Sequence, residues 1–384
     1  MEAQVIAPRI TRLRLNDFRS FQRLDVGFEP MLVALCGENG VGKTNLLEAL
    51  SLLAPGRGLR RAPLVEMARS GGSGGFSIVA DLEGPLGPAL LGTGIEREPG
   101  SLNPTRKTRL NGAPASSSSV FSEHLRIVWM TPSLDGLFNG PPGERRRFVD
   151  RLVLAIDPAH ASRSAALEQA LRSRNRLLEE PRADAQWLDA LERQIAELGI
   201  AIASARRETI ERLAAVILAR REDASAFPFA ELALIGETDA LIAQNSAIEA
   251  EDRMRRSLRD MRQRDRAAGR TLTGPQTSDL LVRHGPKGIE AARASTGEQK
   301  ALLIGLVLAH AHLVAQMSSM APLVLLDEVA AHLDPSRREA LFGVLAALGG
   351  QVFMTGADRA LFGELPDEAR LFDVMQGKVV PAVR

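Results

Sequence analysis

The 384-residue sequence predicts an α/β fold with a flanking antiparallel β subdomain and an inserted helical lobe. An apolar run at residues 31–36 leads into a glycine-rich loop and then into a helical leucine pattern, as in a parallel α/β core. Short alternating segments between residues 76 and 112 predict antiparallel strands with a hairpin turn. From about 148 to 270, Ala, Leu, Arg and Glu recur with helical periodicity, which predicts the lobe.

The chain is long enough for two or three domains, and 45% hydrophobic residues allow a large core. We expect residues 1–147 and 271–384 to form two parts of one α/β lobe, with residues 148–270 inserted as the helical lobe. The longest helical run, residues 187–221, contains Gly199 and is too short for an extended coiled-coil arm.

The composition favours a cytoplasmic protein without a membrane partner. The N-terminal residues lack the long apolar segment of a signal peptide. The most apolar run, Ala301–Ala315, is interrupted by two histidines and is expected to be too short to span a bilayer. The single cysteine, Cys36, excludes an internal disulfide.

A phosphate-binding loop lies in the segment LCGENGVGKTNLLEAL, residues 35–50. It fills every fixed position of the pattern G-x-x-x-x-G-K-[ST], in which glycines let backbone N–H groups turn towards phosphate oxygens. Lys43 would bring positive charge to the β- and γ-phosphates, and the Thr44 hydroxyl would bind Mg²⁺. The segment therefore predicts a nucleoside triphosphate site. Its expected members are Gly37, Glu38, Asn39, Gly40, Val41, Gly42, Lys43 and Thr44.

Two acidic residues follow a second apolar run, in the segment PLVLLDEVAAHLD. Leu323–Leu326 predicts a buried strand whose carboxyl end delivers Asp327 and Glu328 to the sheet edge where ligands of α/β proteins bind. Asp327 would complete the Mg²⁺ shell with Thr44, and Glu328 would orient or deprotonate an attacking water.

A second anion site is expected at the start of the apolar helix that follows STGEQ. Ser295 and Gly297 are placed just before this helix, where a hydroxyl, backbone N–H groups and the positive helix end converge. A chain that already has a phosphate loop would use such a site for the nucleotide of another copy. Here the sequence resembles the ATP-binding-cassette (ABC) ATPases, whose signature motif closes over the partner's ATP. The corresponding residues are Ser295, Thr296, Gly297, Glu298 and Gln299, with Asp334 in the D-loop.

The whole chain resembles the RecF family, bacterial recombination-repair ATPases related to the SMC proteins. About 250 residues separate Lys43 from Ser295, more than in a transporter ATPase and far fewer than in an SMC protein with its long arms. The resemblance rests on LRLNDFRSF at 13–21, GENGVGKTNLLEALSLLAPGRGLR at 37–60, GPPGERRRFVDRLV at 140–153, STGEQKALL at 295–303 and the Asp327-Glu328 block.

This resemblance implies an ABC-type P-loop ATPase head that binds ATP and Mg²⁺ and forms a homodimer on ATP. It implies binding to double-stranded DNA beside single-strand gaps, and work with RecR and RecO that lets RecA load. The expected processes are DNA repair, recombination, replication-fork maintenance and the SOS response. Asp327 and Glu328 would carry a slow, DNA-stimulated ATP hydrolysis, while residues 295–299 would close the neighbour's site.

Several positions depart from the family pattern. The usual Ser-Pro and acidic Q-loop region is TPSLD here, residues 131–135. Thr355 stands where transporter ATPases carry a switch histidine, so it is assigned to γ-phosphate sensing only by position. The segment GPQTSD, residues 274–279, replaces a common Gly-Pro-His-Arg-Asp-Asp. Arg19 is similar to an N-terminal arginine that lies near the nucleotide in this superfamily, and a solvated charge is the alternative.

Arginines are the expected DNA contacts, because they neutralise phosphates without reading sequence. Further candidates are residues 145–147 and the row EDRMRRSLRDMRQRDR from Glu251, which also fits a solvated helix. The absence of tyrosine argues against base-stacking platforms and favours duplex binding. The first candidates are Arg57, Arg60 and Arg61.

Other classes of protein fit parts of the pattern. The main alternative is a nucleotide-binding subunit of another ABC-type assembly, such as a transporter, which would need a membrane partner and a different helical subdomain. A cohesin-like structural ATPase would need long arms. A nucleotide-dependent switch that seldom hydrolyses ATP is the third alternative.

Overall fold

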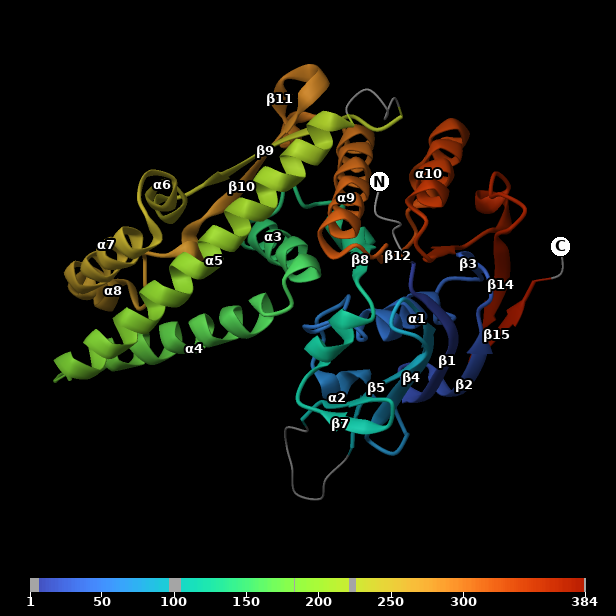
Figure 1. Ribbon diagram of the computed structural model, residues 1–384, viewed down its shortest axis with the longest axis horizontal. Helices are drawn as coiled ribbons and strands as arrows, with labels where there is room; N and C mark the ends of the chain where they lie inside the picture. Colours follow the sequence, from blue (N-terminus) through green and yellow to red (C-terminus); the bar gives the residue numbers. More distant parts are fainter. Residues whose placement is uncertain (1–6, 97–104, 183, 221–225, 383–384) are drawn as a thin grey trace. The chain divides into compact units, whose positions relative to one another are not determined.

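The computed structural model describes residues 7–96, 105–182, 184–220 and 226–382. The chain, coloured along its whole sequence in Figure 1, divides into two compact units. The sheet unit consists of Met1–Asp135, Glu222–Pro228 and Thr296–Arg384, and the helical unit of Gly136–Arg221 and Phe229–Ser295.

A six-stranded, mostly parallel sheet forms the centre of the sheet unit, with strand order β15-β14-β3-β13-β12-β8. Neighbours pair in parallel except β14 and β15, which are antiparallel. The strands are β3 (Leu32–Cys36), β8 (Ile127–Met130), β12 (Leu323–Leu326), β13 (Val352–Gly356), β14 (Arg370–Met375) and β15 (Lys378–Pro381).

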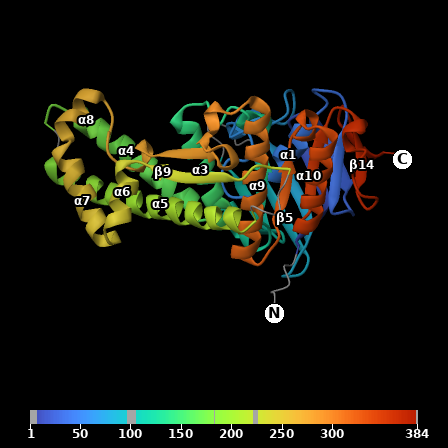
Figure 2. The ribbon, with the colours of Figure 1, turned by 90° about the horizontal axis from the view of Figure 1, so that it is seen from above.

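The central strands are buried on both faces, as in parallel sheets covered by helices. Val33 and Leu35 on one face of β3 join a core that continues through helix α1 (Lys43–Ser51) into the second sheet. Figure 2 shows α9 (Thr296–Ser318) beside α10 (Pro335–Leu348) in this unit. The predicted strand at 323–326 is confirmed, and so is the strand before the phosphate loop.

The predicted antiparallel subdomain is a second six-stranded sheet, with order β2-β1-β4-β5-β6-β7. Asn111 and Gly112 have φ angles of 52° and 83°, which is the hairpin turn expected between the last two strands. A short helix, α2 (Leu64–Met67), lies in the connection from α1. The strands are β1 (Arg9–Phe18), β2 (Phe21–Gly27), β4 (Phe76–Glu83), β5 (Ala89–Ile95), β6 (Lys107–Leu110) and β7 (Ala113–Ala115).

Helix α9 corrects one expectation about the most apolar run. The helix has 23 residues and is, by length and composition alone, long and apolar enough to cross a membrane. The expectation considered only the run Ala301–Ala315, whereas the helix extends beyond this run in both directions. However, 72% of its most apolar window is buried inside the protein, as in the core helix of an α/β fold.

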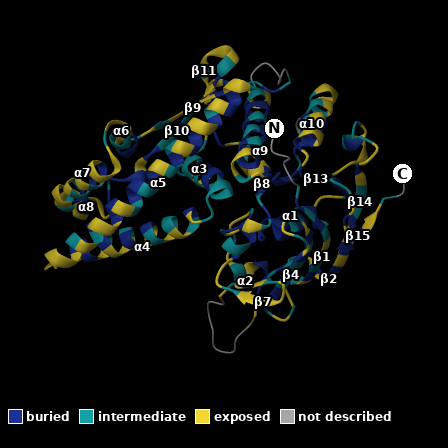
Figure 3. Cartoon of the chain, in the orientation of Figure 1, coloured by how far each residue is buried: buried dark blue, intermediate teal, exposed yellow. Residues whose placement is uncertain are grey.

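The helical unit is built around α5 (Ala185–Ala219), a 35-residue helix with the Asp184 side chain as its N-cap. Figure 3 shows a buried and an exposed face along this helix, in line with its sequence periodicity. Gly199 permits close packing, because a Cβ there would lie 2.7 Å from the terminal methyl of Met254. The other helices are α3 (Pro142–Ile156), α4 (His160–Glu179), α6 (Glu237–Gln244), α7 (Ala247–Asp260) and α8 (Arg262–Ala268).

The helical unit extends beyond the 148–270 lobe expected from composition. A small antiparallel sheet of β11 (Ile289–Glu290), β10 (Asp279–His284) and β9 (Ala230–Ile235) belongs to it, and α3 packs on β10. The main strands are not shorter than the predicted β3 and β12, but β9 lies inside the Ala-, Leu- and Glu-rich segment and β10 lies beyond the expected boundary at residue 270. Across both units, 3₁₀ turns occur at Ser118–Glu123, Pro132–Leu134, Pro275–Thr277, Gly285–Lys287, Ala291–Arg293, Ala330–His332 and Arg359–Phe362.

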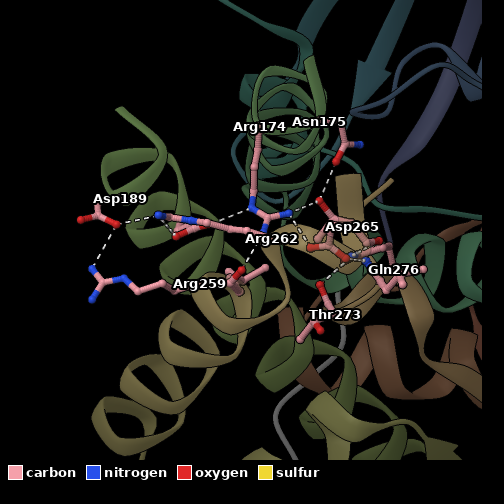
Figure 4. Close-up of polar contacts among 12 residues, drawn as sticks. Arg174, Asn175, Asp189, Arg259, Arg262, Asp265, Thr273 and Gln276 are labelled. Atoms are coloured by element: carbon pink, nitrogen blue, oxygen red, sulfur yellow. Dashed lines mark hydrogen bonds and ion pairs between the residues drawn. The ribbon is translucent and has the colours of Figure 1, made fainter. Parts of the chain in front are cut away.

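A buried polar cluster centred on Arg174 ties the helices of this unit together (Figure 4). The fully buried Arg174 guanidinium donates to Asp265 Oδ2 at 2.7 Å and to Glu192 Oε1 at 3.1 Å. It also donates to the Leu258 carbonyl at 2.7 Å and to Thr271 Oγ1 at 2.9 Å. The cluster therefore joins α4, α5, the end of α7 and α8.

Candidate nucleotide-binding site

The phosphate loop connects β3 to α1, and two of its glycines are required by the backbone. A Cβ at Gly37 would lie 2.3 Å from the Val374 carbonyl oxygen. Gly42 has φ 115° and a Cβ there would lie 2.7 Å from Ser20 Oγ. The loop between them is exposed at Glu38, Asn39 and Gly40, and Val41 is half-buried.

The N-terminus of α1 faces this loop. Gly42 is its N-cap, and no described side chain caps the helix or adds an acidic charge to its first turn. Its first N–H groups therefore remain suited to an anion. Lys43 is 4% exposed and donates to the carbonyls of Gly37 at 2.6 Å and Glu38 at 2.9 Å, which holds its charge inside the loop.

Thr44 and Asp327 meet although they are 283 positions apart in the chain. Thr44 Oγ1 donates to the Asp327 carboxylate at 2.9 Å to Oδ1 and 3.1 Å to Oδ2. Adjacent ligands of an octahedral Mg²⁺ at about 2.0–2.1 Å lie about 2.9 Å apart, so this oxygen pair fits Mg²⁺. The described residues contain no group of three or more His, Cys, Asp or Glu that could hold a metal. The remaining ligands would be phosphate oxygens and water.

Thr355 belongs to the same cluster, and sequence reasoning missed the contact. Its hydroxyl donates to Asp327 Oδ1 at 2.8 Å and accepts the Glu328 N–H at 2.9 Å. The parallel pairing of β12 with β13 brings Thr355 beside Asp327. The only signal in the sequence was that Thr355 stands where transporter ATPases carry a switch histidine.

The electrostatics of Asp327 follow from this burial. Desolvation raises the pKa of its carboxyl above the usual range, and the neighbouring Glu328 charge acts in the same direction. Hydrogen bonds from Thr355 and Thr44, and the charge of Arg60, oppose the increase in pKa. A cation beside the carboxylate would relieve the same unfavourable desolvation.

Arg60 is exposed, but its guanidinium is paired at α1. The fully buried Glu48 of α1 accepts from Arg60 at 3.0 Å and from Arg19 at 2.7 and 2.8 Å. Arg60 also donates to Asn45 Oδ1 at 2.8 Å. Glu48 was not identified from sequence because it lies within a leucine-rich helical pattern.

The signature residues gather at the start of α9. The helix begins at Thr296, so Gly297 lies in its first turn and not before it, which corrects the sequence expectation. Ser295, Thr296 and Gly297 are exposed, Glu298 is half-buried and Gln299 is buried. The next residue, Lys300, pairs with Asp135 of the TPSLD segment at 3.1 Å.

Asp334, the expected D-loop residue, accepts the Arg337 N–H at 2.9 Å and caps α10. In the TPSLD segment, the Thr131 and Ser133 hydroxyls lie 2.8 Å apart. In the GPQTSD segment, Gln276 donates to the Thr273 carbonyl at 2.8 Å. These contacts are internal to the protein.

The arginine candidates differ in whether they pair with acidic side chains of the protein. Arg57, Arg60 and Arg61 are all exposed, and Arg60 is also paired with Glu48. Arg145 forms a two-bond ion pair with Asp279 at 2.7 and 2.8 Å. In the row from Glu251, Arg259 and Arg262 pair with Asp189 at 3.0 and 2.6 Å, so these positions fit the salt-bridged helix alternative.

Comparisons with known proteins place this geometry in context. A family model described as "AAA domain" matches residues 12–62, and one described as "AAA domain, putative AbiEii toxin, Type IV TA system" matches residues 137–355. The chain is 52% identical to the DNA replication and repair protein RecF of Mesorhizobium japonicum over 372 residues, 97% of each chain. It is 54% identical to the RecF protein of Allorhizobium ampelinum over 96% of this chain and 97% of that one.

Solved structures agree on the fold. The structure of the recombination mediator protein RecF-ATP in the RecFOR pathway superposes with a TM-score of 0.83 at 21% identity, covering 98% of each chain. A Pyrococcus furiosus Smc head domain, solved with an extended coiled coil and the C-terminal domain of ScpA, superposes with a TM-score of 0.53 at 17% identity. It covers 98% of this chain and 96% of that one.

Proposed function

This chain belongs to the RecF family, and from that premise we propose that it is an ATP-controlled DNA-binding protein of recombinational DNA repair and replication-fork maintenance. The observation that carries the proposal is the meeting of Thr44, Asp327 and Thr355 beside the uncapped N-terminus of α1. The solved RecF-ATP structure has the same fold.

ATP would bind with its phosphates in the loop of residues 37–44. Lys43 would exchange its carbonyl partners for phosphate oxygens, and the N–H groups of α1 would donate to them. Thr44 and Asp327 would hold Mg²⁺, which when bound neutralises phosphate charge. Glu328 is half-buried beside Asp327, where its carboxylate would orient an attacking water. The proposed reaction is a slow, DNA-stimulated ATP hydrolysis.

The signature residues would act in a second copy of the chain. Ser295, Thr296 and Gly297 are exposed at the positive end of a 23-residue helix, which suits a phosphate group. In an ATP-bound homodimer, Ser295–Gln299 and Asp334 would complete the partner's site. Ser295→Arg would put a large cation on this face, so each subunit would bind ATP but the pair would not close.

DNA binding would come from arginines that contact phosphates. Arg57, Arg60 and Arg61 are all exposed, but Arg60 is also held by Glu48 and would act through the nucleotide site. We propose double-stranded and gapped DNA as the substrate, and RecR, RecO and RecA as members of the same pathway in the cytoplasm. The RecFOR name of the solved relative supports this assignment.

Fluorescence anisotropy of a labelled gapped duplex across a salt series tests the proposal, with and without ATP and Mg²⁺. Tight binding should need ATP and Mg²⁺, and Ser295→Arg should abolish that dependence. Arg57→Ala combined with Arg61→Ala should flatten the plot of log affinity against log salt by roughly 0.9 for each lost phosphate contact. Arg12→Ala, which removes an exposed cation paired with Asp25, is the matched control.

Equal affinity and equal salt slope with and without ATP would contradict the proposal. The protein would then be an ATP-binding member of the family whose nucleotide does not control DNA. An unchanged slope in the Arg57 and Arg61 double variant would instead leave ATP control intact and remove only the DNA-contact assignment.

A further inference from the structure

The hydroxyl of Thr355 is engaged on both sides by the acidic pair. Thr355 is 1% exposed in β13, next to the strand that carries Asp327. It donates to Asp327 Oδ1 at 2.8 Å and accepts from the Glu328 backbone N–H at 2.9 Å. One side chain therefore restrains a carboxylate and the backbone of the next residue at once.

In this arrangement, the hydroxyl proton of Thr355 is already donated to Asp327. A threonine hydroxyl has a single O–H donor, and here Asp327 accepts it. Thr355 cannot then also donate to a γ-phosphate, which is the role expected of a switch residue at this position. The geometry separates Thr355 from that role and links it to the acidic pair.

The backbone of Glu328 shows why the second bond matters. Its φ is 53°, in the left-handed region that is unfavourable for a residue with a Cβ. The N–H of this residue is held by Thr355. Because the direction of a side chain follows its backbone, release of the N–H would let the Glu328 carboxylate turn away.

We propose that Thr355 is a positioning residue for ATP hydrolysis, which fixes the Asp327 carboxylate for Mg²⁺ and holds the Glu328 backbone so that its carboxylate faces the attacking water. Thr355 touches neither nucleotide nor water in this scheme. The inference rests on the proposed function, since it assigns roles within the same site.

The first measurement needs no nucleotide. Amide hydrogen exchange at Glu328 should accelerate at least tenfold in Thr355→Val, because valine keeps the shape and removes the oxygen acceptor. Thr355→Ser should keep wild-type protection, because serine retains the hydroxyl. Thr108→Val, at a 5% exposed threonine of the antiparallel sheet, should leave exchange at Glu328 unchanged.

The second measurement compares ATP binding with turnover in the same variants. Thr355→Val should bind ATP in EDTA as the wild type does, need several-fold more Mg²⁺ for tight binding, and lose at least tenfold in kcat. Thr355→Ser should stay within about threefold of the wild type in both. Should valine prevent folding, Thr355→Ala removes the same hydroxyl with a smaller side chain and is measured in the same way.

The outcomes separate this inference from the proposed function. Unchanged exchange at Glu328 in the valine variant, or faster exchange with wild-type Mg²⁺ dependence and turnover, would overturn the positioning role. Failure of the wild-type protein itself to bind ATP with Mg²⁺ would instead overturn the proposed function, and the inference with it.

Discussion

The sheet unit and the helical unit both place charged side chains in their interiors, but they satisfy them differently. In the helical unit, Arg174 and Asp265 are fully buried, and their partners come from neighbouring helices (Figure 4). In the sheet unit, Lys43 and Asp327 lie beside an exposed loop and a helix N-terminus that no described side chain caps. A closed network contributes to folding, whereas the open cluster is arranged to accept a ligand.

The largest expected effect breaks the closed network. Arg174→Met leaves the buried carboxylate of Asp265 without its cation, so the free energy of unfolding should fall by about 3–5 kcal/mol. Chemical denaturation measures it. Arg172→Met is the matched control on the same helix, since that side chain is 70% exposed and should change stability by less than about 0.5 kcal/mol. Similar losses of stability in both variants would show that the buried network around Arg174 contributes no more than an exposed ion pair.

The sheet unit also contains a buried carboxylate with protein partners, Glu48, whose two arginine partners are partly exposed. Glu48→Gln removes the charge that Arg19 and Arg60 share at α1, and should lower the free energy of unfolding by about 2 kcal/mol. Glu66→Gln, at an exposed glutamate, serves as the control. Thermal unfolding measures the melting temperature of both variants. Equal melting temperatures would show that the Glu48 charge does not stabilise the fold.

A pH-dependent effect of similar size concerns the acid stability of the helical unit. Burial would raise the pKa of Asp150, but hydrogen bonds from His160 and Arg206, with the Arg206 charge, outweigh it and lower the pKa to about 2. The folded pKa lies below the unfolded value of about 3.9, so the contribution is present above pH 4 and lost as the pH falls towards 2.

That contribution is about 1–3 kcal/mol. Asp150→Asn should therefore be less stable than the wild type at pH 7, and the gap should narrow between about pH 4 and pH 2. Denaturation at a series of pH values provides the measurement. If the difference in stability between the two proteins stays constant over this range, the ionised carboxylate of Asp150 does not stabilise the fold.

Local patterns predicted the parts of the site that lie close together in sequence. The loop at 37–44, the strand before it, and the strand that delivers Asp327 and Glu328 are all in the expected places. Each depends on glycine spacing or apolar runs of a few residues. Such signals are readable because their physical cause lies within one element.

The remaining contacts join residues that are distant in sequence. Thr355 and Asp327 are 28 positions apart, and Arg174 and Asp265 are 91 apart. Such pairs depend on strand order and helix packing, which no local pattern states. Arg60 is an example, because the local sequence of a basic segment does not show whether an arginine contacts DNA or pairs with a buried glutamate.

We expect the open cluster in the sheet unit to bind ATP with Mg²⁺. An equilibrium titration of labelled ATP against the wild type and Lys43→Ala tests it most directly, with Lys107→Ala, an exposed lysine paired with Glu96, as the control. Loss of the Lys43 charge should weaken ATP binding by about 2–3 kcal/mol, roughly 30- to 150-fold, while Lys107→Ala leaves it unchanged. Equal ATP affinity in wild type and Lys43→Ala would contradict the account.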